Sequence, residues 1–101
     1  MKKGATAKRK TKSNLSVNVY REFFDLIRIG KKKEEYREVT DYWRRRLEGR
    51  KYGEVHFRNG YLANAPFMRV EWKGIRTIRR NGRRFYAIKL GRVLQVKDKK
   101  K

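Results

Sequence analysis

A change of hydrophobic period at Gly30 most constrains how this chain can fold. Before Gly30, apolar residues recur at intervals of three, four and seven and so share one helix face: Tyr20, Phe23, Phe24 and Ile27. A glycine is favoured just past a helix end, where the left-handed conformation is needed. After Gly30, residues 32–39 lose the helical pattern and alternate, as a strand does. The sequence therefore predicts a helix, a glycine stop and a strand, with the helix aromatics in the core rather than on a base-stacking platform.

The rest of the chain predicts more short strands and one more helix. Alternation of apolar and polar residues predicts strands at residues 15–19, 54–58, 67–72 and 85–90. Thr40 suits the N-cap of a second helix, which would pack Trp43 and Leu47 on the core. Asn81-Gly82 predicts a tight turn inside a basic hairpin, and Gly91 is expected to end its second strand. The predicted class is α+β, with a small, mostly antiparallel sheet and two helices.

A formal net charge of +21 in 101 residues makes polyanions the favoured partners, RNA first and DNA as a further possibility. We expect residues 1–13 to be a basic flexible arm and residues 97–101 a basic tail, around one folded domain at 14–96. The arm holds six basic residues, and the tail holds four Lys and one Asp. The domain therefore retains a net charge of +12, which favours a binding surface on the fold itself. The alternative is that the basic ends only aid solubility.

Several classes of function lack their sequence features. There is no apolar run near 18 residues and no signal-peptide core, so we expect neither membrane insertion nor secretion, but a cytoplasmic protein. The chain has no Cys, which removes thiol chemistry and Cys-based zinc sites. The one histidine, His56, lacks acidic residues at metal-ligand spacing, so no metal or cofactor is expected. The composition does not define an oligomeric state.

Two acidic residues stand in the basic stretch Gly30-x-Lys32-x-x-Glu35-x-Arg37. In a strand, Glu35 and Arg37 fall on one face and can pair, which would keep the carboxylate ionised and fix the guanidinium plane. Such a group can present a planar fork of donors to a phosphate or a base edge. The alternative is a solvated edge strand with incidental ion pairs.

This stretch resembles the signature of the ASCH domain family, and later segments resemble family landmarks in the same order. These segments are Tyr42-Trp43-Arg44-Arg45-Arg46-Leu47, Phe57-Arg58-Asn59-Gly60-Tyr61, Asn64-Ala65-Pro66 and Ile88-Lys89-Leu90-Gly91. The likeness covers roughly residues 15–96. It implies a small β-barrel of the PUA-like superfamily that is associated with RNA, and so an ASCH/PUA-like domain at 14–96.

The resemblance also raises the possibility of catalysis. One bacterial branch of the family removes the acetyl group of acetylated cytidine with a Lys and a Thr in this motif. Lys32 matches the Lys, but Glu35 occupies the Thr position and cannot act as a hydroxyl nucleophile. Other ASCH-like proteins are associated with ribonuclease activity, for which Lys32, Glu35 and His56 are the candidates here. We expect a binding protein rather than an enzyme and assign no catalytic residue.

The predicted function is RNA binding in a basic cleft, on single-stranded or structured RNA. The predicted nucleotide-binding residues are Lys32, Glu35, Arg37, Arg58, Asn59 and Tyr61. The predicted phosphate contacts are Arg44, Arg45, Arg46, Arg79, Arg80, Arg83 and Arg84. Tyr61 would either stack on a base or pack on its own loop. Two other functions remain open: a hydrolase of RNA or modified nucleosides, and a structural protein that coats nucleic acid or belongs to a ribosome.

Overall fold

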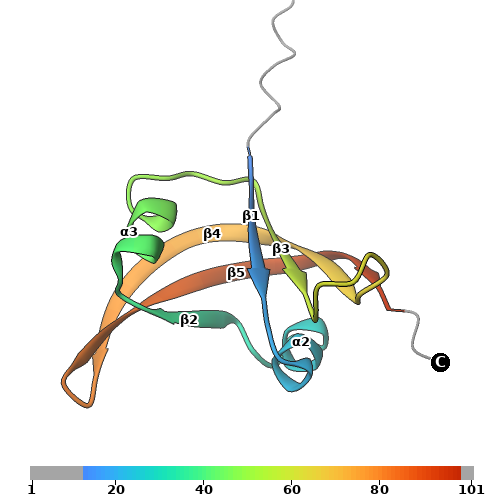
Figure 1. Cartoon of the computed structure of the whole chain (residues 1–101), viewed down its shortest axis with the longest axis horizontal. Helices are drawn as coiled ribbons and strands as arrows, with labels where there is room; N and C mark the ends of the chain where they lie inside the picture. Colours follow the sequence, from blue (N-terminus) through green and yellow to red (C-terminus); the bar gives the residue numbers. More distant parts are fainter. Residues whose placement is uncertain (1–12, 99–101) are drawn as a thin grey trace, which may run out of the picture.

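The computed structural model describes residues 13–98, which form seven helices and strands around one sheet (Figure 1). In chain order they are β1 (Asn14–Asn18), α2 (Arg21–Arg28), β2 (Glu34–Glu38), α3 (Asp41–Leu47), β3 (Glu54–Arg58), β4 (Phe67–Arg80) and β5 (Arg83–Lys97). The predicted α+β class and both predicted helices are confirmed.

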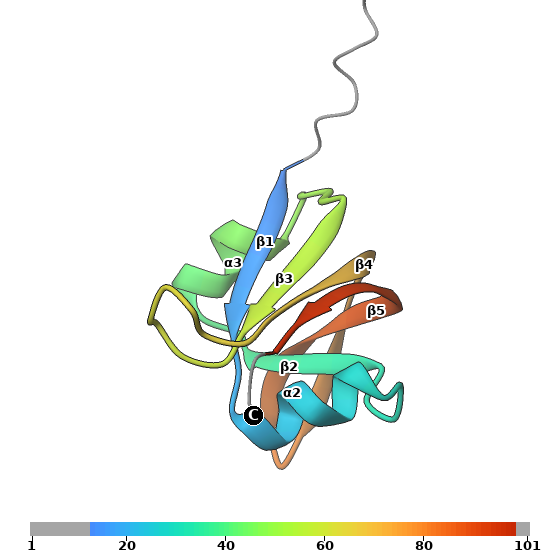
Figure 2. The same ribbon diagram turned by 90° about the vertical axis from the view of Figure 1, so that its right-hand side faces the viewer.

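The sheet is mixed and has the strand order β1-β3-β4-β5-β2. β1 runs parallel to β3, and the other three ladders are antiparallel. The sheet is not closed into the barrel that the ASCH resemblance implies, because β1 and β2 are its edge strands and share no ladder within residues 13–98. A side chain links the two edges instead: Arg37 Nη2 on β2 donates to the carbonyl oxygen of Asn18, the last residue of β1, at 2.9 Å. Figure 2 shows the sheet curving between these edges.

Strands β4 and β5 form a long, bent hairpin. Asn81 and Gly82 have φ of 50° and 76° at its end, as the predicted tight turn requires. The prediction that Gly91 ends the strand is wrong, because β5 continues through it to Lys97. Register shifts between Val70 and Ile75 bend the ladder there instead. A Cβ at Gly91 would lie 2.5 Å from Glu71 Oε1, so glycine serves a close approach of the two strands rather than a strand end.

The core lies between the curved sheet and the helices. Phe24 and Ile27 of α2 and Leu47 of α3 are fully buried, and they pack with inward residues of every strand except β2: Leu15, Val17, Val55, Phe57, Met68, Val70, Tyr86, Ile88 and Leu90. Tyr20 does not join the helix face as predicted, because it is the N-cap of α2 and is 76% exposed. Gly30 does end this helical segment, with φ of 84° and its N–H bonded to the Ile27 carbonyl.

The described part of the chain includes the inner ends of the predicted arm and tail. The Ser13 carbonyl accepts from Gly53 N–H, and Lys97 pairs with Phe67 in the β4–β5 ladder. Asp98 pairs with Arg21 of α2 at 2.5 Å. The remainder of the predicted arm and tail, residues 1–12 and 99–101, lies outside the described residues. Neither helix within 13–98 has the length and apolar character needed to cross a membrane.

Candidate nucleic-acid interface

The predicted Glu35–Arg37 pair forms, and it is more buried than an edge strand would suggest. Glu35 is only 6% exposed. Its Oε2 lies 3.1 Å from Arg37 Nη2, and its Oε1 lies 3.4 Å from Lys32 Nζ. The Arg37 guanidinium also lies over the Trp43 ring, with 5.3 Å between Cζ and the ring centroid. Together with its bond to the Asn18 carbonyl, these contacts fix the plane of the guanidinium.

Two polar atoms of this pair are buried without a hydrogen-bond partner in the described structure. They are Glu35 Oε1, an acceptor, and Arg37 Nε, a donor. Glu35 Oε1 keeps its ion pair with Lys32 at 3.4 Å. Buried polar groups are normally satisfied, so the missing hydrogen bonds leave both side chains able to take a polar ligand or water.

Two asparagines position the loop 59–66 beside the pair. Asn18 bonds both ways with Gly60, through Nδ2 to the carbonyl at 3.0 Å and through Oδ1 from the N–H at 3.2 Å. Asn59 Nδ2 donates to the Val19 carbonyl at 3.0 Å. The loop is thereby fixed to the end of β1, and Tyr61 stands out from it with 90% of its surface exposed. Packing of the Tyr61 ring on its own loop, one of the two predicted alternatives, is therefore wrong.

Two cavities adjoin at Arg37. The first, here called the Glu35 cavity, has a volume of about 530 Å³ and is lined by Glu35, Arg37, Asn59 and Tyr61, with Tyr20 and Phe23 from the α2 side. The second, the Arg46 cavity, has a volume of about 430 Å³ and is lined by Arg37, Arg46, Arg58, His56, Tyr42 and Tyr61. Asn18, Arg37 and Tyr61 line both, so the two cavities are neighbouring parts of one groove.

Five of the six predicted nucleotide-binding residues line this groove, and Lys32 does not. The Lys32 ammonium group lies over the Phe23 and Tyr36 rings, 5.1 and 5.0 Å from their centroids, and lines a different cavity. Sequence reasoning missed Asn18, which lines both cavities and holds the loop. Its partner Gly60 is 42 residues away, and an isolated Asn at a strand end gives no sign of such a contact.

The three catalytic candidates are not brought together. Lys32 and Glu35 are paired with each other, whereas His56 bonds to Glu54 at 2.9 Å and packs edge-on against Phe67. His56 lines the Arg46 cavity and Glu35 lines the other, with Arg37 between them. In the described part of the chain, no three His, Cys, Asp or Glu side chains are grouped so that they could hold a metal ion.

The predicted phosphate contacts divide into two groups, one on α3 and one at the β4–β5 turn, which lie on the same side of the molecule (Figure 1). Arg46 lines the groove and lies over the Tyr42 and Trp43 rings, with 5.1 and 5.8 Å between Cζ and the centroids. Arg80, in contrast, lies over Tyr36 at 5.3 Å. Arg83 pairs with Glu38 at 3.3 Å. The hairpin arginines thus flank the motif strand β2 rather than line the groove.

Carboxylates outside the groove are strongly held as anions. Two hydrogen bonds from Arg69, both 2.8 Å, and a further one with His56 lower the pKa of Glu54 to about 2. Hydrogen bonds from Arg76 and Tyr36 lower the pKa of Glu34. These acids therefore neutralise particular arginines rather than the groove.

Comparison with models of known protein families, with curated proteins and with solved structures finds no match for this chain.

Proposed function

We propose that the chain binds RNA that offers at least one unpaired nucleotide, with the base in the Glu35 cavity and an adjoining phosphate in the Arg46 cavity. The observation that carries the proposal is the division of one groove by Arg37, with the Glu35 carboxylate lining one side and two further arginines lining the other. This arrangement pairs a site for a base edge with a site for an anion.

The Glu35 cavity suits a nucleobase in chemistry. The Glu35 carboxylate, which lines the cavity, can accept from an exocyclic amino group, and Arg37 can meet the acceptors of a base edge. Proteins that recognise single-stranded RNA stack splayed bases on aromatic rings. Three exposed tyrosines surround the groove: Tyr61 at 90%, Tyr20 at 76% and Tyr42 at 59% exposure. Tyr61 lines both cavities and is the first choice for a stacking ring.

The Arg46 cavity suits a phosphate. Arg37, Arg46 and Arg58 line it without a carboxylate among the lining residues. The buried Nε of Arg46, like that of Arg37, has no hydrogen-bond partner in the described structure. Arginine forks match phosphate oxygens in geometry, so two unused donors beside one cavity favour that ligand. The arginines of α3 and of the hairpin would extend the electrostatic contact.

The resemblance of the motif to ASCH domains supports the same proposal, because that family is associated with RNA. In this interpretation the curved sheet is an open form of a PUA-like barrel, with Arg37 linking the two edge strands that a closed barrel would pair. The proposal concerns RNA binding and does not depend on catalysis.

The test is fluorescence anisotropy with a labelled 12-nucleotide single-stranded RNA, a perfect RNA duplex and the matching single-stranded DNA. We expect the single strand to bind more tightly than the duplex. Tyr61→Ala should weaken binding by about 5–150-fold, the equivalent of about 1–3 kcal/mol for one stacked base. Arg37→Ala should also flatten discrimination among RNA sequences. The matched control is Arg92→Ala, which removes an arginine that is 82% exposed in its side chain and lines neither cavity.

Other outcomes would select the other functions. Equal losses from Arg37→Ala and Arg92→Ala, with no preference among RNAs or for single strands, would overturn the proposal in favour of a coating protein. Gel analysis of the same RNA tests for a hydrolase, and we expect intact RNA and no acetate release from acetylated cytidine. Cleavage by the parent that is lost in both Lys32→Ala and Glu35→Ala would establish an enzyme.

A further inference from the structure

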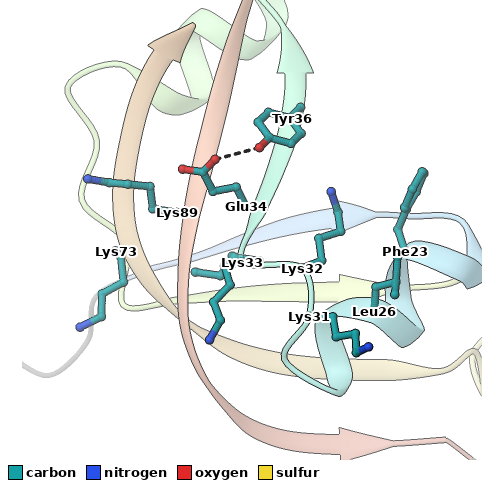
Figure 3. A pocket seen from close by; sticks show the side chains of 10 residues that line it. Phe23, Leu26, Lys31, Lys32, Lys33, Glu34, Tyr36, Lys73 and Lys89 are labelled. Atoms are coloured by element: carbon teal, nitrogen blue, oxygen red, sulfur yellow. Dashed lines mark hydrogen bonds between the residues drawn. The ribbon is translucent and has the colours of Figure 1, made fainter.

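A third cavity, of about 770 Å³, is lined by Lys32 together with residues of α2, the α2–β2 segment, β2, β4 and β5 (Figure 3). Lysines from three elements surround it: Lys31 and Lys33 from the α2–β2 segment, Lys73 from β4 and Lys89 from β5. A fifth lysine, Lys32, also lines the cavity and is paired with Glu35. We call the cavity with its five lysines the lysine basin. Phe23, Leu26 and Leu90 supply its apolar surface.

The basin is a product of the fold rather than of a run of lysines. The turn at Gly30 is closed by Lys31 N–H to the Leu26 carbonyl at 2.9 Å. The segment then meets β5, where Leu90 N–H donates to the Lys33 carbonyl at 3.1 Å. In the β4–β5 ladder, the irregularity between Trp72 and Ile75 places Lys73 and Gly74 beside Lys89. Gly74 has a φ of 101°, which glycine adopts readily, and a Cβ there would be in ordinary contact with the Lys89 stem, 3.9 Å from Cε.

Four of the five basin lysines form no ion pair in the described part of the chain. Within residues 13–98, no carboxylate lies in ion-pair distance of Lys31, Lys33, Lys73 or Lys89. One acid, Glu34, lines the basin, but Arg76 holds it with two hydrogen bonds of 2.8 and 3.0 Å and Tyr36 with another of 2.8 Å. Like charges brought together without a counter-charge repel, so an anion bound there relieves that repulsion.

We propose that the lysine basin binds backbone phosphates of the same RNA strand whose nucleotide occupies the groove. The inference rests on the proposed function. The inference is supported because the basin adjoins the Glu35 cavity: Phe23 and Tyr36 line both. Basin, Glu35 cavity and Arg46 cavity therefore form one series across the molecule, which a polymer can follow and a free nucleotide cannot.

The direction of the lysines also favours a strand over a compact anion. In Figure 3 the ammonium groups of Lys33, Lys73 and Lys89 do not point to a common centre. Lysine is a flexible point charge that contacts phosphate without the fixed geometry of arginine. Spread lysines of this kind suit successive phosphates and would add affinity without sequence preference.

The test is the salt dependence of binding of the 12-nucleotide RNA to the double variant Lys73→Gln/Lys89→Gln. Each phosphate contact on a single strand contributes about 0.7 to the slope of log K against log salt. Losing two contacts should lower the magnitude of the slope by about 1.4. The control Lys51→Gln/Lys97→Gln removes the same charge from exposed positions that line none of the three cavities, and it should lower the slope less. Lys73→Arg/Lys89→Arg should retain the parent slope.

The outcomes separate this inference from the proposed function. If the parent binds no RNA, the proposed function fails and the inference with it. If the parent binds RNA through Arg37 and Tyr61 but the basin and control variants have equal slopes, the inference alone is overturned. Inorganic tripolyphosphate should compete only weakly with the RNA. The inference would be overturned in favour of a small polyphosphate ligand by two results together: tight tripolyphosphate binding that the basin variant abolishes, and an RNA salt slope that this variant leaves unchanged. Thermal melts must first show that the variants are folded.

Discussion

Removing the charge of Glu35 should destabilise the fold far more than removing any exposed carboxylate. Glu35 is 6% exposed and separates two cations, Lys32 and Arg37, whose side chains are 16% and 25% exposed. Breaking a buried ion pair from one side typically costs about 3–5 kcal/mol, because the partner is left buried and uncompensated. Both cations here keep some contact with water, and a glutamine can still accept from Arg37. We therefore expect Glu35→Gln to lower the free energy of unfolding by about 2–3 kcal/mol.

Such a loss would be large for a domain of this size, since it corresponds to a fall of about 8–24 °C in the melting temperature. Urea denaturation at low salt, followed by tryptophan fluorescence, measures it directly. The matched control is Glu38→Gln on the same strand, which breaks a pair with Arg83 whose side chains are 45% and 66% exposed. That change should stay within about 0.5 kcal/mol of the parent.

The effect of Glu35→Gln should persist at high salt, because buried pairs are poorly screened. In addition, Lys32→Met combined with Glu35→Gln should cost less than the two single changes together, since the second cation is then gone. A loss from Glu35→Gln no larger than that from Glu38→Gln would refute the view that this carboxylate holds two cations together in the core.

Three further stability predictions follow from single contacts. Tyr86→Phe removes a 2.6 Å hydrogen bond from a buried hydroxyl to Glu48 and should cost about 1–2 kcal/mol in urea denaturation at neutral pH. Glu54→Gln should lower the free energy of unfolding by about 1–2 kcal/mol at pH 7. Arg69 lowers the Glu54 pKa from 4.5 to about 2, so the carboxylate loses its stabilising charge as the pH falls through this range. In a pH series of melts, the difference between variant and parent should therefore shrink from pH 4.5 toward pH 2. The Thr40 hydroxyl caps α3 by accepting from a backbone N–H at 3.2 Å. Thr40→Ala should therefore lower the free energy of unfolding by about 1 kcal/mol in urea denaturation, whereas Thr40→Ser should keep the parent stability.

Local patterns predicted most of the secondary structure. The helix and strand on either side of Gly30, the cap at Thr40 and the Asn81-Gly82 turn each depend on residues close in sequence, and each is present. The local sequence at Gly91 predicts a strand end, because a glycine in a strand is ambiguous by itself. Its role is set by Glu71, twenty residues away, whose side chain occupies the space that a Cβ would need.

The site was only partly predictable for the same reason. The spacing of Glu35 and Arg37 in a strand predicts their pairing, but it does not show that the carboxylate would be buried or that Arg37 would contact Asn18 and Trp43. Lys32 lies outside the groove, with its ammonium group over the Phe23 and Tyr36 rings, and the pattern of charges along the chain does not reveal these contacts. The lysine basin depends on an irregular ladder register, which no spacing along the chain defines.

The division of charge between arginine and lysine ties these features together. Of the ten acidic residues in the chain, eight contact an arginine in the described structure: Asp25, Glu34, Glu35, Glu38, Asp41, Glu54, Glu71 and Asp98. Among the lysines of residues 13–98, only Lys32 forms an ion pair with a carboxylate, that of Glu35. Planar arginine forks make the bidentate pairs that hold strands together, whereas mobile, strongly hydrated lysines are left without partners. Because the acids pair with arginines, the unpaired positive charge of residues 13–98 lies on lysines and on the remaining arginines of the groove, the α3 region and the β4–β5 hairpin. In the proposed function, an RNA backbone would neutralise this charge.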